Sequence, residues 1–154
     1  MNDNKHASFN MLIELSKNRV DTAGNQLGHL VRKYRAAEHQ LNVLKEYRQD
    51  YATRLTGAGQ NGITASNYRN FTRFLETLND AIVQQTRVMM HLDQNISVSK
   101  ENWRREQQRL HSYETLQTRR ARQHMAIENR REQIVSDELS AAIHRRSYPD
   151  RGLQ

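Results

Sequence analysis

Residues 9–55 read FNMLIELSKNRVDTAGNQLGHLVRKYRAAEHQLNVLKEYRQDYATRL, and apolar side chains return in this stretch at alternating steps of four and three. The repeat is polar only at Ser16 and Arg48. A mean step of about 3.5 residues keeps one face of a helix turned towards a partner helix and winds the pair left-handed. The stretch therefore predicts one long helix of a coiled coil. Its seam positions are Phe9, Ile13, Ser16, Val20, Ala23, Leu27, Leu30, Tyr34, Ala37, Leu41, Leu44, Arg48, Tyr51 and Leu55.

The segment that follows contains the strongest helix-breaking signal in the chain. Gly57, Gly59 and Gly62 fall within a few residues of one another, with Asn61 among them. We expect the first helix to span about residues 5–56 and a loop to span about residues 57–65. Either Ser66 or Thr64 then has the side chain to cap the next helix by accepting a hydrogen bond from its first free amides.

A second stripe with the same spacing predicts a second helix over about residues 66–145, followed by a short tail, residues 146–154. A loop of about ten residues cannot return the chain to the start of the first helix, so the two helices pair antiparallel. A fold-back at residue 60 would bring Phe9 near His111 and leave the second helix overhanging beyond about residue 116. The stripe consists of Phe71, Leu75, Leu78, Ile82, Gln85, Met89, Leu92, Ile96, Ser99, Trp103, Glu106, Leu110, Tyr113 and Gln117.

Composition supports an elongated all-α hairpin that forms a single domain over residues 1–154. Only 36% of the residues are hydrophobic, and the only proline is Pro149. The mean hydropathy of −0.98 is too polar for a chain with a filled globular core. The sequence has no cysteine and no apolar run long enough to cross a membrane. These features favour a cytoplasmic protein.

Catalysis, metal binding and cofactor binding are all disfavoured by the pattern. The seven histidines fall on scattered helix faces without metal-ligand spacing. A two-helix rod offers no concave pocket for an acid–base pair, and the chain has no Gly-rich phosphate-binding loop. We expect a protein without catalytic, cofactor-binding or metal-binding residues.

The formal net charge of +7 indicates an acidic partner: nucleic acid, anionic lipid or an acidic protein surface. Arginines gather at 119–122, 130–131 and 145–146, but acidic residues alternate with them. Because these carboxylates repel phosphates, nucleic-acid binding is the less favoured alternative.

A further stripe of residues, partly in the seam and partly beside it, runs along both helices near the loop. Tyr47 and Phe74 in this stripe are placed to be exposed, while Leu44, Tyr51, Leu78 and Gln85 belong to the seam. The stripe either widens the core or forms an apolar patch for a partner. Its members are Gln40, Leu44, Tyr47 and Tyr51 on the first helix and Phe74, Leu78, Ala81 and Gln85 on the second.

At this point the sequence resembles the FliJ family of flagellar type III export proteins. Similar segments include Glu38-His39-Gln40-Leu41, Asn61-Gly62-Ile63 and the run from Trp103 to Leu110. Leu44, Tyr47, Tyr51, Asn67-Tyr68, Thr115-Leu116-Gln117 and Glu128-Asn129-Arg130 extend the resemblance over nearly the whole chain.

The resemblance implies a non-enzymatic stalk of the flagellar export apparatus, peripherally associated with the inner membrane. One partner would be the hexameric export ATPase, whose ring would receive the paired termini. The other would be the cytoplasmic domain of the export gate protein FlhA, at the loop-proximal end. Export chaperones are further expected partners. A stalk of a virulence type III secretion system is the alternative within the same architecture.

Carried over residue by residue, the resemblance assigns two sets of contacts. The gate contacts, or gate set, are Gln40, Leu44, Tyr47, Tyr51, Phe74, Leu78 and Ala81; where one member of the family has a histidine next in this stripe, this chain has Gln85. The ring contacts, or ring set, lie on the basic and half-apolar overhang; they are Arg119, Arg120, Arg122, Ile127, Arg130, Arg131 and Ile134.

Overall fold

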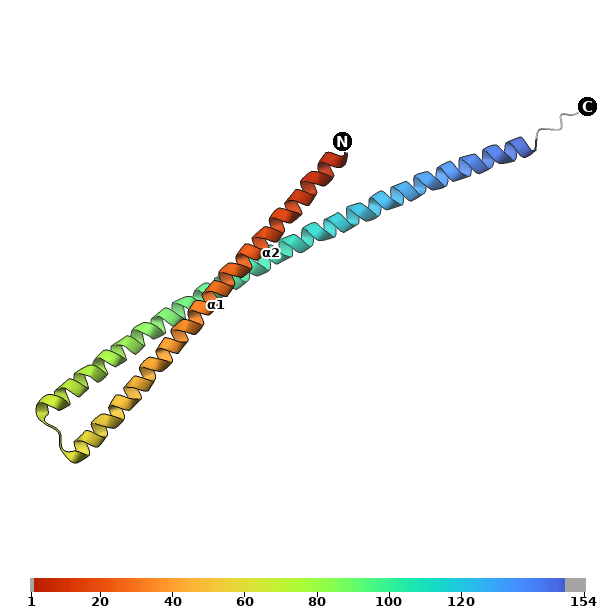
Figure 1. Ribbon diagram of the computed structural model, residues 1–154. Coiled ribbons are helices and arrows are strands. Elements are labelled where there is room, and N and C mark those ends of the chain that lie inside the picture. Colours follow the sequence, from red (N-terminus) through yellow and green to blue (C-terminus); the bar gives the residue numbers. More distant parts are fainter. Residues whose placement is uncertain (1, 149–154) are drawn as a thin grey trace, which may run out of the picture. The chain divides into compact units, whose positions relative to one another are not determined.

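The computed structural model describes residues 2–148 as two helices joined by a short loop (Figure 1). Helix α1 spans Asn2–Asn61 and helix α2 spans Ala65–Ser147. No strand occurs within residues 2–148. The predicted all-α helical hairpin, with the second helix longer than the first, is confirmed.

The chain divides into two compact units. Unit 1 comprises Met1–Leu15 and Arg109–Gln154, and unit 2 comprises Ser16–Gln108. Each unit therefore contains a piece of α1 and a piece of α2. The single domain expected over residues 1–154 stays a prediction.

The core of unit 2 lies along the predicted seam. Ala23, Ala37, Leu41, Leu78 and Ile82 are all less than one-tenth exposed. The other seam positions of this unit are half-buried, apart from the buried Ser16. Burying one large apolar side chain contributes roughly 2 kcal/mol, so a row of such positions holds two helices together without a filled globular core.

Polar contacts across unit 2 show that its helices run antiparallel. The Gln85 side chain donates to the Ala37 carbonyl oxygen at 2.9 Å. Nearer the loop, the Arg48 guanidinium donates to Asn79 Oδ1 at 3.3 Å. At the other end of the unit, a Cβ added at Gly24 would lie 3.4 Å from the Trp103 indole nitrogen. As the residue numbers on α2 increase, the numbers of their partners on α1 therefore decrease.

The loop is shorter than the sequence predicted. Helix α1 continues through Gly57 and Gly59, and the chain leaves the helix at Gly62, whose φ is +85°. The expected loop over residues 57–65 and the helix end at residue 56 were therefore wrong. The physical reason is that one glycine costs a helix only about 1 kcal/mol relative to alanine, which a continuing seam outweighs. A positive φ, in contrast, ends the helix directly.

The start of α2 confirms one of the two predicted caps. Thr64 Oγ1 accepts a hydrogen bond from the Asn67 amide at 3.2 Å, and the Thr64 carbonyl accepts one from the Tyr68 amide at 3.0 Å. This is the geometry of an N-cap residue. Ser66 lies inside the helix instead.

The pairing register in unit 1 also differs from the expected one. The Gln117 side chain donates to Asn10 Oδ1 at 2.8 Å, and the Arg120 guanidinium carbon lies 4.8 Å from the centroid of the Phe9 ring. Phe9 therefore faces residues about two helical turns beyond His111. Because α1 runs on to Asn61, the fold-back point moves towards the C-terminus, and each residue of that shift moves the partner by two.

Beyond Tyr113, no side chain of α2 is more than partly covered by the residues that the structure describes. Every residue from Glu114 to Tyr148 is exposed. Helix α2 ends at Ser147, two residues later than expected, and residues 149–154 of the predicted tail lie outside the described residues. Within residues 2–148, neither helix has an apolar stretch of the kind that crosses a bilayer.

Candidate partner-binding surfaces

In unit 2, the seven residues of the gate set split into exposed and covered side chains. Tyr47 is 54% exposed and Phe74 is 40% exposed, whereas Leu78 is 6% exposed. Gln40 is exposed, and Leu44, Tyr51 and Ala81 are half-buried. We call the exposed ring pair Tyr47 and Phe74, with Tyr51 between them, the aromatic patch.

The aromatic patch is organised around Tyr51. Its ring centroid lies 4.3 Å from that of Phe74 and 6.0 Å from that of Phe71. Tyr47 precedes Tyr51 by one helical turn, which puts both side chains on the same face of α1. Tilted aromatic pairs at these separations stabilise one another beyond simple area burial. The patch is therefore a braced apolar surface with two accessible rings.

A glutamine in the seam of unit 2 connects the two helices. Gln85 Nε2, which donates to the Ala37 carbonyl, also lies 3.3 Å from Gln40 Oε1. This contact holds the amide group of the exposed Gln40 in place. A polar seam residue with a defined partner fixes the register of a coiled coil, and Gln85 is such a residue.

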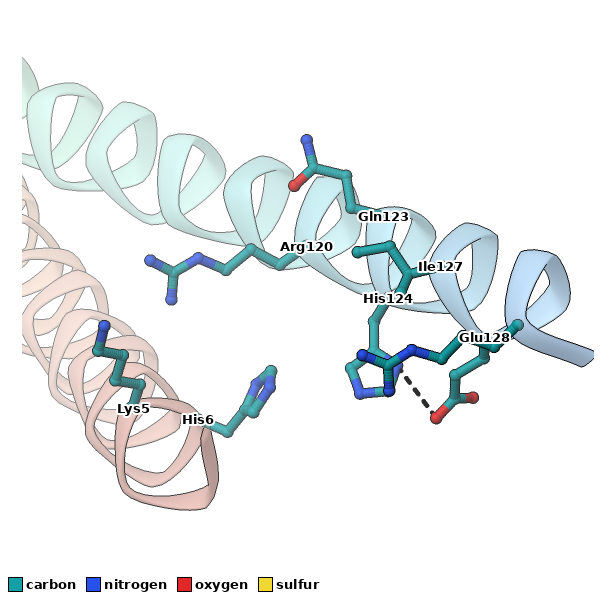
Figure 2. A pocket seen from close by; sticks show the side chains of 8 residues that line it. Lys5, His6, Arg120, Gln123, His124, Ile127 and Glu128 are labelled. Atoms are coloured by element: carbon teal, nitrogen blue, oxygen red, sulfur yellow. Dashed lines mark ion pairs between the residues drawn. The ribbon is translucent and has the colours of Figure 1, made fainter. Parts of the chain in front are cut away.

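Unit 1 contains a groove between the start of α1 and the middle of its α2 segment (Figure 2). Its volume is about 450 Å³. Lys5 and His6 come from α1, and the remaining side chains come from α2 (Figure 2). We call this site the basic groove; its lining residues are Lys5, His6, Arg120, Gln123, His124, Ile127, Glu128 and Arg131.

Two imidazoles face each other across the basic groove. The ring centroids of His6 and His124 are 6.4 Å apart and the rings are tilted by 55°. His124 Nδ1 lies 3.3 Å from Glu128 Oε1 (Figure 2). The two histidines belong to different helices, so spacing along one helix could not predict that they meet. Only the corrected register brings residues so distant in sequence together.

The electrostatics of the basic groove are those of an anion site. Lys5, Arg120 and Arg131 line it as three cations, against the single carboxylate of Glu128. A neighbouring groove of about 440 Å³ shares Lys5 and Arg120 with it. Among residues 2–148, no group of three or more metal-ligating side chains gathers in a way that would hold a metal ion.

The structure separates the seven residues of the ring set into two groups. Arg120, Ile127 and Arg131 line the basic groove. Arg119, Arg122, Arg130 and Ile134 do not line it, and all four are exposed. Sequence reasoning missed Lys5, His6, Gln123, His124 and Glu128. The one signal available was the i,i+4 spacing of His124 and Glu128, which indicates a local ion pair.

Large apolar side chains are exposed along α2 from the basic groove towards the end of the helix. Each is more than half exposed within the part of the chain that the structure describes. These residues are Ile127 at 55%, Ile134 at 51%, Val135 at 63%, Leu139 at 62% and Ile143 at 57%. A run of exposed branched apolar residues among arginines is typical of a surface that a partner covers.

The fold and these surfaces define a class of protein: a long α-helical hairpin whose accessible aromatic, basic and apolar side chains are suited to protein contacts. Comparison with known proteins identifies the family. Residues 5–148 match the family model described as Flagellar FliJ protein. The chain belongs to the FliJ family.

Curated relatives agree with this assignment. The Flagellar FliJ protein of Salmonella typhi is 32% identical over 136 residues, which cover 88% of this chain and 92% of the relative. The Flagellar FliJ protein of Escherichia coli (strain K12) is 31% identical over the same coverage. The family supports a component of the flagellar export apparatus, and it favours the flagellar interpretation over the virulence alternative.

Proposed function

We propose that this chain is a non-enzymatic stalk that couples the flagellar export ATPase to the export gate, and that it also escorts export chaperones. It works in the cytoplasm, peripherally associated with the inner-membrane export apparatus. The observation that carries the proposal is the presence of two different contact surfaces on one hairpin: an apolar aromatic patch in unit 2 and an exposed basic and apolar α2 segment in unit 1.

The aromatic patch is the proposed contact for the cytoplasmic domain of FlhA. Tyr47 and Phe74 offer large rigid rings, a side-chain type enriched at the energetic centre of interfaces. Tyr51 braces Phe74 from within the hairpin, so the patch loses little side-chain freedom when a partner binds. Leu78, at 6% exposure, supports the patch from the seam rather than contacting the partner.

The exposed part of α2 in unit 1 is the proposed contact for the ATPase ring. Isolated helices are marginal in water, and most helical stability comes from packing of an apolar face. A helix that keeps Ile134, Leu139 and Ile143 more than half exposed gains that packing when a partner surrounds it. The arginines of the ring set add charge complementarity to an acidic lining.

The gate contact is tested by binding of the full chain to the purified cytoplasmic domain of FlhA. The double variant Tyr47→Ala, Phe74→Ala should bind more than about fivefold more weakly while keeping its helicity. Tyr68→Ala is the matched control, because Tyr68 is 52% exposed and lies outside the gate set. If Tyr68→Ala weakened FlhA binding equally, the assignment of the gate contact to the aromatic patch would be wrong.

The ring contact is tested with the export ATPase and a chain truncated after Arg131, which keeps all residues of the basic groove. Loss of ATPase binding together with unchanged FlhA binding is the expected result. The full-length variant Ile134→Gln, Leu139→Gln controls for the loss of chain length and should reproduce the defect. Normal ATPase binding by both chains would overturn the assignment of this segment.

Nucleic-acid binding remains the second candidate, favoured by the net charge of +7. It predicts that binding of duplex DNA falls steeply as salt rises, because phosphate contacts release counterions. The gate contact, in contrast, is apolar and should respond little to salt. DNA binding that is tight at physiological salt and still weakens steeply as the salt is raised further would favour the nucleic-acid alternative over the stalk.

A further inference from the structure

The basic groove of unit 1 is more than a patch of solvated arginines. Its cations come from both helices: Lys5 from α1, and Arg120 and Arg131 from α2. The Arg120 guanidinium lies over the Phe9 ring at 4.8 Å, which holds one of these cations in place. Cations that converge on one concave site act together on a single anion.

Two imidazoles, those of His6 and His124, complete the lining of the groove. A neutral imidazole presents one N–H donor, and a protonated imidazole presents two and carries a positive charge. Nδ1 of His124 lies 3.3 Å from Glu128 Oε1, and the second ring nitrogen, Nε2, can also donate to a ligand when the ring is protonated. The charged groups facing the imidazole pair are Lys5, Arg120, Arg131 and Glu128.

We propose that the basic groove accepts carboxylate side chains of an acidic segment of a protein partner, and that His6 and His124 strengthen this contact as the pH falls. The inference rests on the proposed ring contact and deepens it, since it names the chemistry by which the start of α1 and the middle of α2 hold the partner. A metal ion is the wrong ligand here, because three cations repel it.

A protein carboxylate fits the site better than a phosphate polymer does. Glu128 lies within the groove, and Glu132 and Asp137 follow on the same helix. A nucleic acid carries a phosphate at every nucleotide and meets these charges, whereas a polypeptide can place uncharged residues opposite them. Ile127 lines the groove at 55% exposure. An apolar side chain beside cations suits a polypeptide that alternates acidic and apolar residues.

The first test uses a fluorescent peptide of alternating glutamate and alanine as the probe, with the full chain, at about pH 8 and about pH 6. Wild-type binding should tighten by about two- to fivefold at the lower pH, since each exposed ion pair contributes a modest free energy. The variant His6→Gln, His124→Gln should lose this tightening. If the variant tightens as the wild type does, the imidazole role is wrong.

Neighbouring residues provide matched controls for the groove itself. Arg131→Gln should weaken peptide binding more than Arg130→Gln, because only Arg131 lines the groove. Glu128→Gln should strengthen binding more than Glu132→Gln, for the same reason. Equal effects within either pair would show a diffuse charge effect and would overturn the site. Circular dichroism checks that every variant keeps its helicity.

The same variants with the export ATPase separate this inference from the function on which it rests. Weaker ATPase binding by Arg131→Gln than by Arg130→Gln supports both the groove and the ring contact. ATPase binding that is equal in wild type and all groove variants overturns the groove and leaves the ring contact standing. No ATPase binding at either pH, with the peptide response intact, overturns the ring contact alone. Duplex DNA bound with the same variant dependence would overturn the choice of a carboxylate ligand.

Discussion

The two units of this hairpin are built from the same two helices but use their side chains in opposite ways. Unit 2 buries Ala23, Ala37, Leu41, Leu78 and Ile82 along its seam. Unit 1 has Ile13, at 5% exposure, as its one buried apolar residue among those described, and α2 is exposed from Glu114 onwards. The comparison teaches that unit 2 supplies most of the folding free energy and that unit 1 retains apolar surface for a partner.

The largest expected effect is a difference in unfolding free energy between two leucine truncations, one in each unit. Leu41→Ala removes a side chain that is 8% exposed and should lower the free energy of unfolding by about 3 kcal/mol, the range for large-to-small changes in a packed seam. Leu139→Ala removes one that is 62% exposed and should change it by less than about 0.5 kcal/mol. Urea unfolding followed by circular dichroism measures both; similar losses would break the comparison between the units.

The next largest effect should be confined to unit 1. Ile13→Ala opens the only strongly buried apolar position described there and should cost about 2 kcal/mol locally. Amide hydrogen exchange should show lost protection over residues 2–15, with protection near Leu41 unchanged. Leu12→Ala, at 37% exposure, is the control. Loss of protection throughout the chain would show that the two units unfold together.

A smaller effect distinguishes the two candidate caps at the loop end of unit 2. Thr64→Ala removes the hydroxyl that accepts from the Asn67 amide and should destabilise the start of α2 by about 1 kcal/mol. Ser66→Ala changes a residue inside the helix and should be neutral or slightly stabilising. Hydrogen exchange at the Asn67 amide reports the difference. A larger defect from Ser66→Ala would place the cap elsewhere.

The smallest effects, opposite in sign, should come from the glycines near the loop. Gly57→Ala and Gly59→Ala place a Cβ in open space within a helix and should each stabilise it by somewhat under about 1 kcal/mol. Gly62→Ala forces a side chain into a φ of +85° and should destabilise the turn by about the same amount. Thermal unfolding of the three variants measures the signs; stabilisation by Gly62→Ala would contradict the position of the turn.

The candidate sites were predictable to different degrees for the same physical reason. Tyr47 and Phe74 follow from helix periodicity, because the spacing of residues on one helix fixes which side chains flank its seam. His6 and His124 belong to different helices, so their meeting depends on the register between them. The same holds for Arg131 and Arg130, adjacent in sequence, of which only Arg131 lines the groove.

By itself the sequence determined that this chain forms two long helices that pair along defined stripes, because its apolar residues recur about every 3.5 positions. Only the tertiary structure decided where the chain turns. Gly57 and Gly59 weaken a helix without ending it, whereas Gly62 ends α1 through its positive φ. Since each residue added before the turn moves every partner by two, that choice set the register, paired Phe9 with Arg120, and assembled the basic groove.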